Sequence, residues 1–340
     1  MQIFQHFHFF RPIAVGAFFV LMNLNQQAIA SNENEFSPFF VNNVLPISIG
    51  LGLPKTLSAN TLEKGQKKLT LNLGVKSNAN DAGSSNGEML QLDGETYSLD
   101  VGFTYGLTRR WQLDAQISYL RHTGGSLDNL IDSWHDFFSL DDGDRPLFEQ
   151  DQFQFSYSDG NVDESIDESV DGISDLRVGL GYLVKSFGSS NVFLRAGLSL
   201  PTGDADKLTG SDDVDADIGI YTNGRGTNRW RNLGWHANLG YLIIGDDQAL
   251  GVSTQSGAWF SSLGGYWAIS QRLVLKSQFD LHGSFFESGI DELASSANEV
   301  TVGFAYKTKK SGSFDVFFSE DISVNRGADF SFGVSHKILF

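Results

Sequence analysis

The chain ends in the stretch Phe330-Ser-Phe332-Gly-Val334-Ser-His336-Lys-Ile338-Leu-Phe340, and this stretch decides the fold. Large, mostly apolar side chains occupy every second position, and small or polar residues lie between them. A period of two is typical of a β-strand with one apolar face. The end of the chain is therefore predicted to be a strand that shows one face to an apolar environment.

Residues 1–30 have the organisation of a secretory signal. Arg11 is their only formal charge, an apolar run follows from Ile13 to Leu24, and Ala28-Ile-Ala30 places small residues where a signal peptidase cleaves. A retained membrane anchor is the alternative, but it needs roughly 20 apolar residues and this run is shorter. Residues 1–30 are therefore predicted to be a signal peptide that is removed after Ala30.

The composition narrows the class of protein. The net charge of −17 argues against nucleic-acid binding, which needs a basic surface. Many Gly (37) and Phe (28) with few Pro (6) suit a sheet that closes on itself. The chain has no Cys, which fits export without disulfides and excludes lipidation at a Cys. No metal-ligand spacing such as an EF-hand loop occurs, so neither a metal nor a cofactor is expected.

Runs with a period of two recur along nearly the whole chain after residue 66. They cover residues 69–75, 97–105, 111–119, 176–184, 192–200, 214–220, 233–243, 256–268, 273–281, 300–306, 314–318 and 330–340. The run at 256–268 is ambiguous because both of its faces carry aromatic residues. Phe153, Phe155 and Tyr157 also alternate, but we place them inside a long loop because a wall strand there would break the pattern of connections.

The connections between these runs are alternately short and long. The long ones are residues 77–93, 121–174, 201–213, 245–254, 285–297 and 320–327. Short periplasmic turns and long outer loops produce this asymmetry in outer-membrane barrels. The predicted fold class is therefore all-β, a transmembrane antiparallel up-and-down β-barrel of twelve strands over residues 66–340, with both termini in the periplasm. The terminal aromatic residue Phe340 then resembles the assembly signal read by barrel-assembly machinery.

A soluble β-sandwich or a lipocalin-like barrel is the alternative to a membrane barrel. Such a fold buries its apolar face inside and does not need twelve strands with long loops on one side. Aromatic residues near the predicted strand ends, such as Trp111, Tyr119 and Trp267, favour the membrane barrel because they form girdles at the two interfaces.

If the apolar side chains of each strand face lipid, the side chains between them face the barrel interior. Charged groups of both signs and His residues occupy these positions. The candidate lumen-facing residues are Lys68, Lys76, Asp100, Asp114, Arg177, Arg195, Asp215, Asp217, His236, Lys276, Asp280, His282 and Glu299. Two interpretations stay open: an interior filled by ion pairs, which stabilises a narrow barrel, and a polar conduit.

Residues 31–65 precede the first strand and are rich in Phe and Pro. The segment contains Ser37-Pro-Phe39-Phe40-Val41, Leu45-Pro46 and Leu53-Pro54. A loose periplasmic leader and a plug that folds back into the lumen both fit this composition. We favour partial ordering at or inside the periplasmic mouth.

The longest insertion, residues 122–174, contains a predicted amphipathic helix from Leu127 to Leu140 in an outer loop. Aspartates line one side, and the apolar side carries Leu127, Leu130, Ile131, Trp134, Phe137 and Phe138. An apolar stripe outside the cell must be covered, so we expect the helix to cap the barrel mouth or to lie at the membrane interface. On this basis the loop is expected to control access to the lumen. The acidic runs at 141–144 and 163–171 are either solvated or bridged to lipopolysaccharide by a divalent cation.

An outer-membrane phospholipase is the enzyme alternative, because that class of enzyme also uses a twelve-stranded barrel. It needs a Ser paired with a His and an orienting group. His282-Gly-Ser284 is the one suggestive spacing, but the alternation points both side chains inward. An inward His more often completes a hydrogen-bond network, so no catalytic residue is assigned.

Several segments resemble a known family. They are Leu92-Asp-Gly-Glu-Thr-Tyr97 within residues 87–97, Tyr105-Gly-Leu-Thr108, Arg121-His-Thr-Gly-Gly125, Trp134-His-Asp136 and Leu200-Pro-Thr-Gly-Asp204. Together they are similar to an uncharacterised bacterial family catalogued as domain of unknown function 3187, which is regarded as an outer-membrane family. The Leu-Pro-Thr-Gly-Asp element and the Gly-Leu-Thr turn also resemble barrels linked to the uptake of aromatic compounds. The resemblance supplies no catalytic residues.

The sequence thus favours an outer-membrane barrel for passive transport or binding of small solutes, hydrophobic ones included. The alternatives are a structural or lipopolysaccharide-contacting barrel without transport and, third, a phospholipase. The expected partners are outer-membrane lipids, lipopolysaccharide, the barrel-assembly machinery and an unidentified small solute.

Overall fold

A computed structural model describes residues 37–340 except 43, 139–143, 247, 309–311 and 324. The predicted signal peptide lies outside these residues, as do the side chains of Trp134 and Phe138 and the predicted end of the helix at Leu140. None of the described helices is long and apolar enough to cross a membrane.

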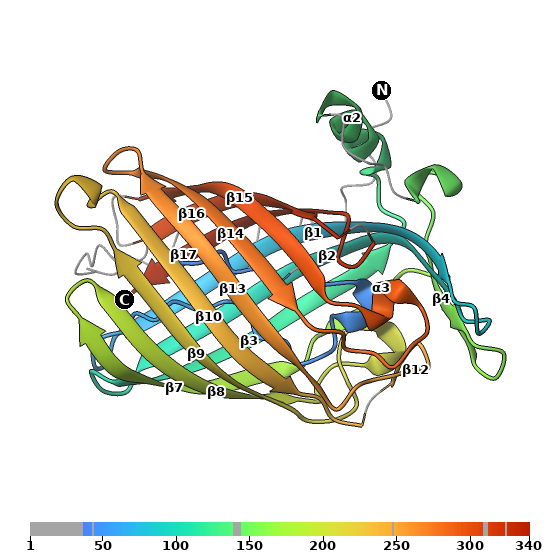
Figure 1. Ribbon diagram of the computed structural model, residues 1–340, viewed down its shortest axis with the longest axis horizontal. Helices are drawn as coiled ribbons and strands as arrows, with labels where there is room; N and C mark the ends of the chain where they lie inside the picture. The colour runs from blue at the N-terminus through green and yellow to red at the C-terminus, as the bar shows by residue number, and fades with distance from the viewer. Residues whose placement is uncertain (1–36, 43, 139–143, 247, 309–311, 324) are drawn as a thin grey trace.

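Twelve antiparallel strands form a closed barrel (Figure 1). In wall order they are β1 (Lys67–Gly83), β2 (Met89–Gly106), β3 (Trp111–Thr123), β7 (Leu176–Phe187), β8 (Ser190–Leu200), β9 (Asp215–Arg225), β10 (Leu233–Ile243), β13 (Gly257–Ala268), β14 (Leu273–His282), β15 (Ala297–Lys307), β16 (Gly312–Asp321) and β17 (Phe330–Leu339). The predicted twelve-stranded barrel is confirmed.

The barrel closes where the first and last strands pair. β1 and β17 are in antiparallel register from Lys68 opposite Leu339 to Ser77 opposite Phe330. Phe340 adds one more rung, because its N–H donates to Lys67 O (3.0 Å) and its carbonyl accepts from Lys67 N–H (2.8 Å). The last residue of the chain therefore completes the seam.

Deletion of Phe340 is expected to reduce the yield of folded barrel, because it removes these two backbone hydrogen bonds and the terminal aromatic anchor. The yield is measured as the heat-modifiable band on cold SDS gels of membrane fractions. Phe340→Tyr keeps both backbone groups and an aromatic ring, and should fold like the parent. Equal yields from the deletion and the parent would contradict the assembly role.

The alternation of the strands separates two faces of the wall. On β8, Leu194 and Leu198 are exposed on the outside, whereas Arg195 between them is 2% exposed. The strand with aromatics on both faces, β13, turns Phe260 and Tyr266 inward and leaves Trp259 and Trp267 outside. An apolar outer face is what a lipid environment requires, and the inner face carries the polar residues.

The connections are one-sided, as the sequence indicates. The short-turn end of the barrel carries the turns at 107–110, 188–189, 226–232 and 269–272 and the connection from β15 to β16, and the long-loop end carries the others. The prediction of a loop over residues 77–93 is wrong, because β1 and β2 continue as a hairpin with a turn at 84–88. This hairpin projects past the rim at the long-loop end (Figure 1).

The projecting hairpin is extended by strands from the long insertion. β4 (Gln154–Ser158) pairs with residues 89–93 of β2, and β5 (Asp163–Ile166) pairs with β4. β6 (Val170–Ile173) continues the wall beside β3. Phe155 and Tyr157 therefore lie on a strand outside the twelve-stranded wall, and both are buried against the hairpin's Leu90 and Leu92.

Smaller elements lie between the strands and in the segment before β1. They are the 3-10 helices η3 (Pro46–Ser48), η4 (Arg145–Leu147), η5 (Ala205–Lys207) and η6 (Asn228–Trp230, in a short turn), the strand pair β11 (Gln248–Ala249) with β12 (Val252–Ser253), and the short helix α3 (Asp291–Ala294). The helices and strands of the long loops crowd the same end of the barrel (Figure 1).

The amphipathic helix forms but does not cap the barrel mouth, whereas the alternative position at the membrane interface stays a prediction. α2 (Asp128–Phe138) stands to one side of the rim (Figure 1). Leu130 is 62% exposed and Phe137 is 79% exposed, Leu127 is half-buried, and only Ile131 of the described apolar residues is fully buried. The acidic side of the helix docks instead, because Asp128 and Asp132 bind the guanidinium of Arg145 at 2.7 Å and 3.2 Å.

Candidate functional site

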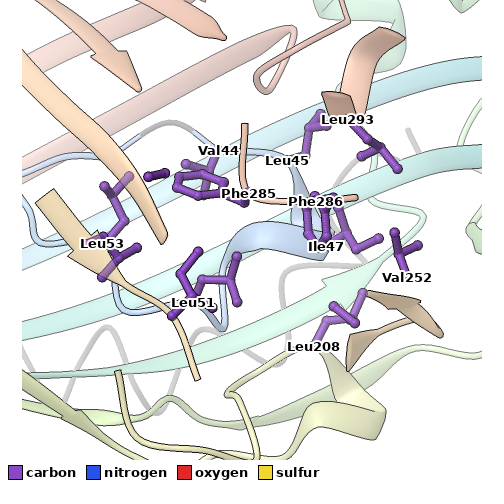
Figure 2. Close-up of a cluster of buried hydrophobic side chains, with 14 of the residues drawn as sticks. Val44, Leu45, Ile47, Leu51, Leu53, Leu208, Val252, Phe285, Phe286 and Leu293 are labelled. Carbon is purple, nitrogen blue, oxygen red and sulfur yellow. The ribbon is translucent and has the colours of Figure 1, made fainter. Parts of the chain in front are cut away.

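Residues 37–65, called here the lumenal segment, run inside the barrel. The segment begins near the short-turn end, where Lys337 Nζ donates to Ser37 Oγ (2.8 Å). It reaches the long-loop end at η3, where Ile47 packs against Phe285 and Phe286 (Figure 2). It then returns to the short-turn end, where Gly65 N–H donates to Gly106 O (2.8 Å) and β1 begins. The segment thus forms a hairpin-like path along the lumen.

Wall cations hold the backbone carbonyls of this segment. Lys337 Nζ donates to Pro38 O (2.8 Å), and Lys76 Nζ donates to Asn42 O (2.6 Å). The guanidinium of Arg177 donates to Leu51 O (2.5 Å) and to Leu53 O. The backbone carbonyls of the segment therefore satisfy hydrogen-bond donors of these three wall cations.

Wall acceptors bind the donors of the segment in the same way. Asp215 Oδ2 accepts the N–H of Gly52 (2.7 Å), and Gln278 Oε1 accepts the N–H of Phe39 (2.9 Å). A Cβ at Gly52 would stand 2.5 Å from the Asp215 Cβ, so the close approach requires glycine. The backbone of the lumenal segment is therefore fitted to this wall.

One ion pair joins the segment to the wall. Lys55 Nζ lies 2.6 Å from Asp100 Oδ1, and both residues are buried. Asp100 also accepts from Asn72 Nδ2 (2.7 Å) and Ser118 Oγ (2.5 Å). The Lys55 ammonium lies 4.7 Å above the Phe40 ring, a cation–π distance. Asp100 is thus the best-satisfied carboxylate described along this path.

A buried apolar cluster lies inside the barrel and extends beneath the loops of the long-loop end. Val44, Leu45, Ile47, Leu51 and Leu53 of the lumenal segment belong to one buried cluster (Figure 2). The wall and loop members of this cluster include Phe193, Leu208, Tyr221, Leu242, Val252, Phe260, Phe285, Phe286 and Leu293. The lumen of a water-filled porin is polar. The apolar cluster therefore distinguishes the interior of this barrel from that of a water-filled porin.

The wall also carries ion pairs that do not involve the segment. Arg195 lies between two carboxylates, 2.8 Å from Asp114 and 2.7 Å from Asp217, and its side chain is 1% exposed. Asp315 lies between two ammonium groups, 2.9 Å from Lys276 and 2.8 Å from Lys337. These triads fill part of the cross-section with side chains.

The structure brings most of the predicted lumen-facing residues together around the lumenal segment. Lys76, Asp100, Arg177, Asp215 and Asp280 contact it directly, the last through Thr56 Oγ1 (3.4 Å). Asp114, Arg195, Asp217 and Lys276 form the wall triads, and Glu299 accepts from Thr301 Oγ1 (2.9 Å). Lys68 lines a cavity of about 30 Å³ beside Phe40.

The inward histidines complete local networks. His236 bonds Tyr266 through Nδ1 and Ser262 Oγ through Nε2 (3.3 Å), and its ring stacks on Tyr266. The His282 ring stacks on Phe285 at 4.3 Å, and its Nδ1 donates to Gly283 O (2.8 Å). Ser284 Oγ donates to Phe286 O and Leu293 O. His282 and Ser284 are therefore used to shape the loop after β14.

Two residues of this site were not among the predicted set. Lys337 lies at an inward position of β17, in series with Ser331, Gly333 and Ser335, so the alternation of the final strand could have identified it. Lys55 lies in an irregular segment, where no periodicity indicates which way a side chain points. Little free space remains: the cavity between the segment and β1–β3, lined by Phe40, Asp100 and Arg177, measures about 60 Å³.

A second polar cluster lies outside the barrel wall, at the long-loop end. Arg145 binds Asp128, Asp132 and Ser77 Oγ and lies 3.9 Å from Asp329. Burial, reinforced by Asp128, raises the pKa of Asp93 in the projecting hairpin to about 7. Burial also raises the pKa of Asp329 to about 7, against the opposing charge of Arg145. Among the described residues, no group of three His, Cys, Asp or Glu side chains is arranged to hold a metal ion.

Known structures share the architecture. The COG4313 outer membrane channel from Pseudomonas putida F1 is 13% identical with a TM-score of 0.53, over 83% of this chain and 98% of that one. The CymD monoaromatic hydrocarbon channel (10% identity, TM-score 0.40, 88% and 98% covered) and the P. putida toluene transporter TodX (10%, 0.37, 87% and 91%) are less similar in structure. The first match shows that the barrel has the fold of an outer-membrane channel.

The sequence comparisons give a family and no characterised relative. No curated protein matches the chain. The model of a family described as "Protein of unknown function (DUF3187)" matches residues 17–338, nearly the whole chain. The chain therefore belongs to the DUF3187 family.

Proposed function

We propose that this barrel is a passive outer-membrane channel for small apolar solutes, and that the lumenal segment closes it in the conformation described here. The observation that carries the proposal is the buried apolar cluster inside the barrel. Apolar solutes partition into an apolar lining, whereas ions and sugars do not. The proposed orientation in the membrane places the long-loop end outside the cell and the short-turn end, with both termini, in the periplasm.

The lumenal segment occupies the path that a solute would take. Its apolar tip, residues 44–53, packs into the apolar cluster, and Leu51 O and Lys55 contact the charged wall residues Arg177 and Asp100. Transport then requires the tip to leave its site while the solute replaces its contacts. The solute's contacts with residues such as Phe285 and Leu242 would offset the loss of those with Ile47 and Leu51.

A structural barrel without transport is the second candidate, and one observation favours it. The backbone of the segment is held at both ends and in the middle, by Lys337, Lys76 and Arg177. If the segment never moved, these contacts would keep the lumen permanently filled.

A reversible lock separates the two candidates. The chain has no cysteine, so Thr56→Cys with Asn238→Cys introduces the only thiols; Asn238 Nδ2 lies 3.4 Å from Thr56 Oγ1. We expect intact bacterial cells, whose lipopolysaccharide leaflet resists apolar solutes, to lose uptake of radiolabelled toluene when they carry the oxidised double variant, and to regain it on reduction. The single Cys variants are the matched controls and should be insensitive to reductant. Equal uptake by the oxidised and reduced forms would contradict movement of the segment, and no uptake by either form or by the parent would favour the structural barrel.

A further inference from the structure

The lipid-facing surface of the wall has an aromatic rung near the long-loop end. Val75 of β1 lies opposite Tyr97 of β2 and opposite Phe332 of β17, so the three residues form one rung, and Phe332 is 43% exposed. They point away from the lumen, because Lys76 next to Val75 points inward and successive side chains of a strand alternate. Aromatic side chains near strand ends lie at the interface between acyl chains and headgroups. The rung therefore marks the edge of the apolar band.

The next rung towards the long-loop end holds the insertion that contains α2. Ser77 and Glu95 form this rung and also point outward. Glu95 Oε1 accepts the N–H of Leu127 (2.5 Å) at the start of the helix, and Ser77 Oγ accepts from Arg145 Nη1 (3.1 Å). A Cβ at Gly125 would stand 1.9 Å from the Glu95 carboxyl carbon, so this close approach requires glycine. Since a step of two residues along a strand is about 6.6 Å, α2 is attached to the outer face of the wall one rung beyond the aromatic edge (Figure 1).

The docked helix exposes apolar side chains. Arg145 binds Asp128 (2.7 Å) and Asp132 (3.2 Å), so this acidic side of α2 is held towards the wall. Leu130 is 62% exposed and Phe137 is 79% exposed, and a spacing of seven residues places them on one side of the helix. The exposed Asp136 lies about 100° round the helix from Phe137. The helix thus presents an apolar side and a polar side to its surroundings.

We infer that Leu130 and Phe137 insert among the acyl chains of the lipid leaflet at the long-loop end, so that α2 is an interfacial helix tied to the wall through Glu95 and Arg145. An amphipathic helix in this position buries its apolar side about 5–10 Å into the boundary between headgroups and acyl chains. Lipid is favoured over a second copy of the chain as the occupant, because the aromatic rung beside the attachment point already faces lipid. The insertion does not depend on transport, and only the identity of the leaflet rests on the orientation proposed above.

The test places one nitroxide label at a time on the full-length chain, which has no Cys of its own. The labelled variants are Leu130→Cys and Phe137→Cys, with Asp136→Cys as the matched control on the same helix. In phosphatidylcholine liposomes, EPR power saturation compares collisions of each label with O2, which concentrates among acyl chains, and with a water-soluble nickel chelate. We expect the labels at 130 and 137 to favour O2 and to lie about 5–10 Å inside the headgroup boundary, and the label at 136 to favour the nickel chelate.

Two further labels calibrate the scale. Ile218→Cys on the outer face of β9 (58% exposed in the parent) gives the value for lipid. Met89→Cys in the projecting hairpin (63% exposed in the parent) gives the value for water. Heat-modifiability of every labelled variant ensures that only folded barrels are compared.

Three outcomes would overturn the inference. Labels at 130 and 137 that match the label at 89 would place the apolar side of α2 in water. A preference for O2 at 136 equal to that at 137 would mean that the helix has no side in water. Labels that meet neither reagent, and whose spectra sharpen when unlabelled protein is added, would assign this surface to a second copy of the chain. No solute is used, so failure of the channel proposal and failure of the helix insertion are distinguishable.

Discussion

A chain in which the predicted signal peptide, residues 1–30, is joined directly to residue 62 is expected to form an open pore. The truncation removes residues 37–61 from the lumen, and with them the apolar tip and the Lys55–Asp100 pair. Arg177 and Lys76 then lose their carbonyl partners, so water enters to solvate them. Planar-bilayer recordings should show resolved single-channel steps for the truncated protein, where the intact chain stays near the baseline.

The matched control for this truncation replaces α2 (Asp128–Phe138) with a Gly/Ser linker. Because α2 stands beside the rim and exposes Leu130 and Phe137, its loss should leave the conductance of the intact chain unchanged. The control thus separates the lumenal segment from the loop helix that the sequence suggested as a gate. A truncated barrel that folds and does not conduct would show that wall side chains, such as the Arg195 triad, close the lumen by themselves.

Arg195→Ala is expected to destabilise the barrel by about 3–5 kcal/mol, because it leaves two buried carboxylates, Asp114 and Asp217, without their cation. Urea titrations of the refolded protein in detergent, read by heat-modifiability, measure the loss. The triple variant Arg195→Met/Asp114→Asn/Asp217→Asn removes the whole triad and should recover most of the stability. Arg110→Ala in an exposed turn should change it by less than about 0.5 kcal/mol. A stable Arg195→Ala barrel would mean that water reaches the triad.

The wall could be predicted from the sequence because the lipid imposes a period of two on every strand that it touches. β8 shows this rule, because Leu194 and Leu198 at even-numbered positions are exposed and Arg195 at an odd-numbered position is buried. The projecting hairpin could not be predicted in the same way. Between Ser77 and Asp81 both faces are small or polar, because this part of β1 leaves the wall and no longer has a lipid face. The β2 edge of this hairpin pairs with β4, which lies more than sixty residues further along the chain.

The lumenal contacts are harder to predict for a chemical reason. Arg177 and Lys337 bind backbone carbonyls, and every residue offers a carbonyl, so the partner leaves no mark on the sequence. The face by which α2 docks could not be predicted for a related reason. Its apolar stripe and its aspartates are equally clear in the sequence, and the distant Arg145 decides which side docks. A pattern thus reveals that a helix has two faces, but the partner determines which of them is buried.

The seam between β1 and β17 fixes the order in which the molecule can be assembled. β1 and β17 come from opposite ends of the barrel sequence. The edges with which they face each other therefore stay unpaired until β17 has joined the sheet. That last strand carries Lys337, whose ammonium holds Ser37 and Pro38 at the start of the lumenal segment. One strand therefore supplies both the closing edge of the wall and the contacts that hold the start of the segment, so closure of the barrel and docking of the segment are thermodynamically coupled.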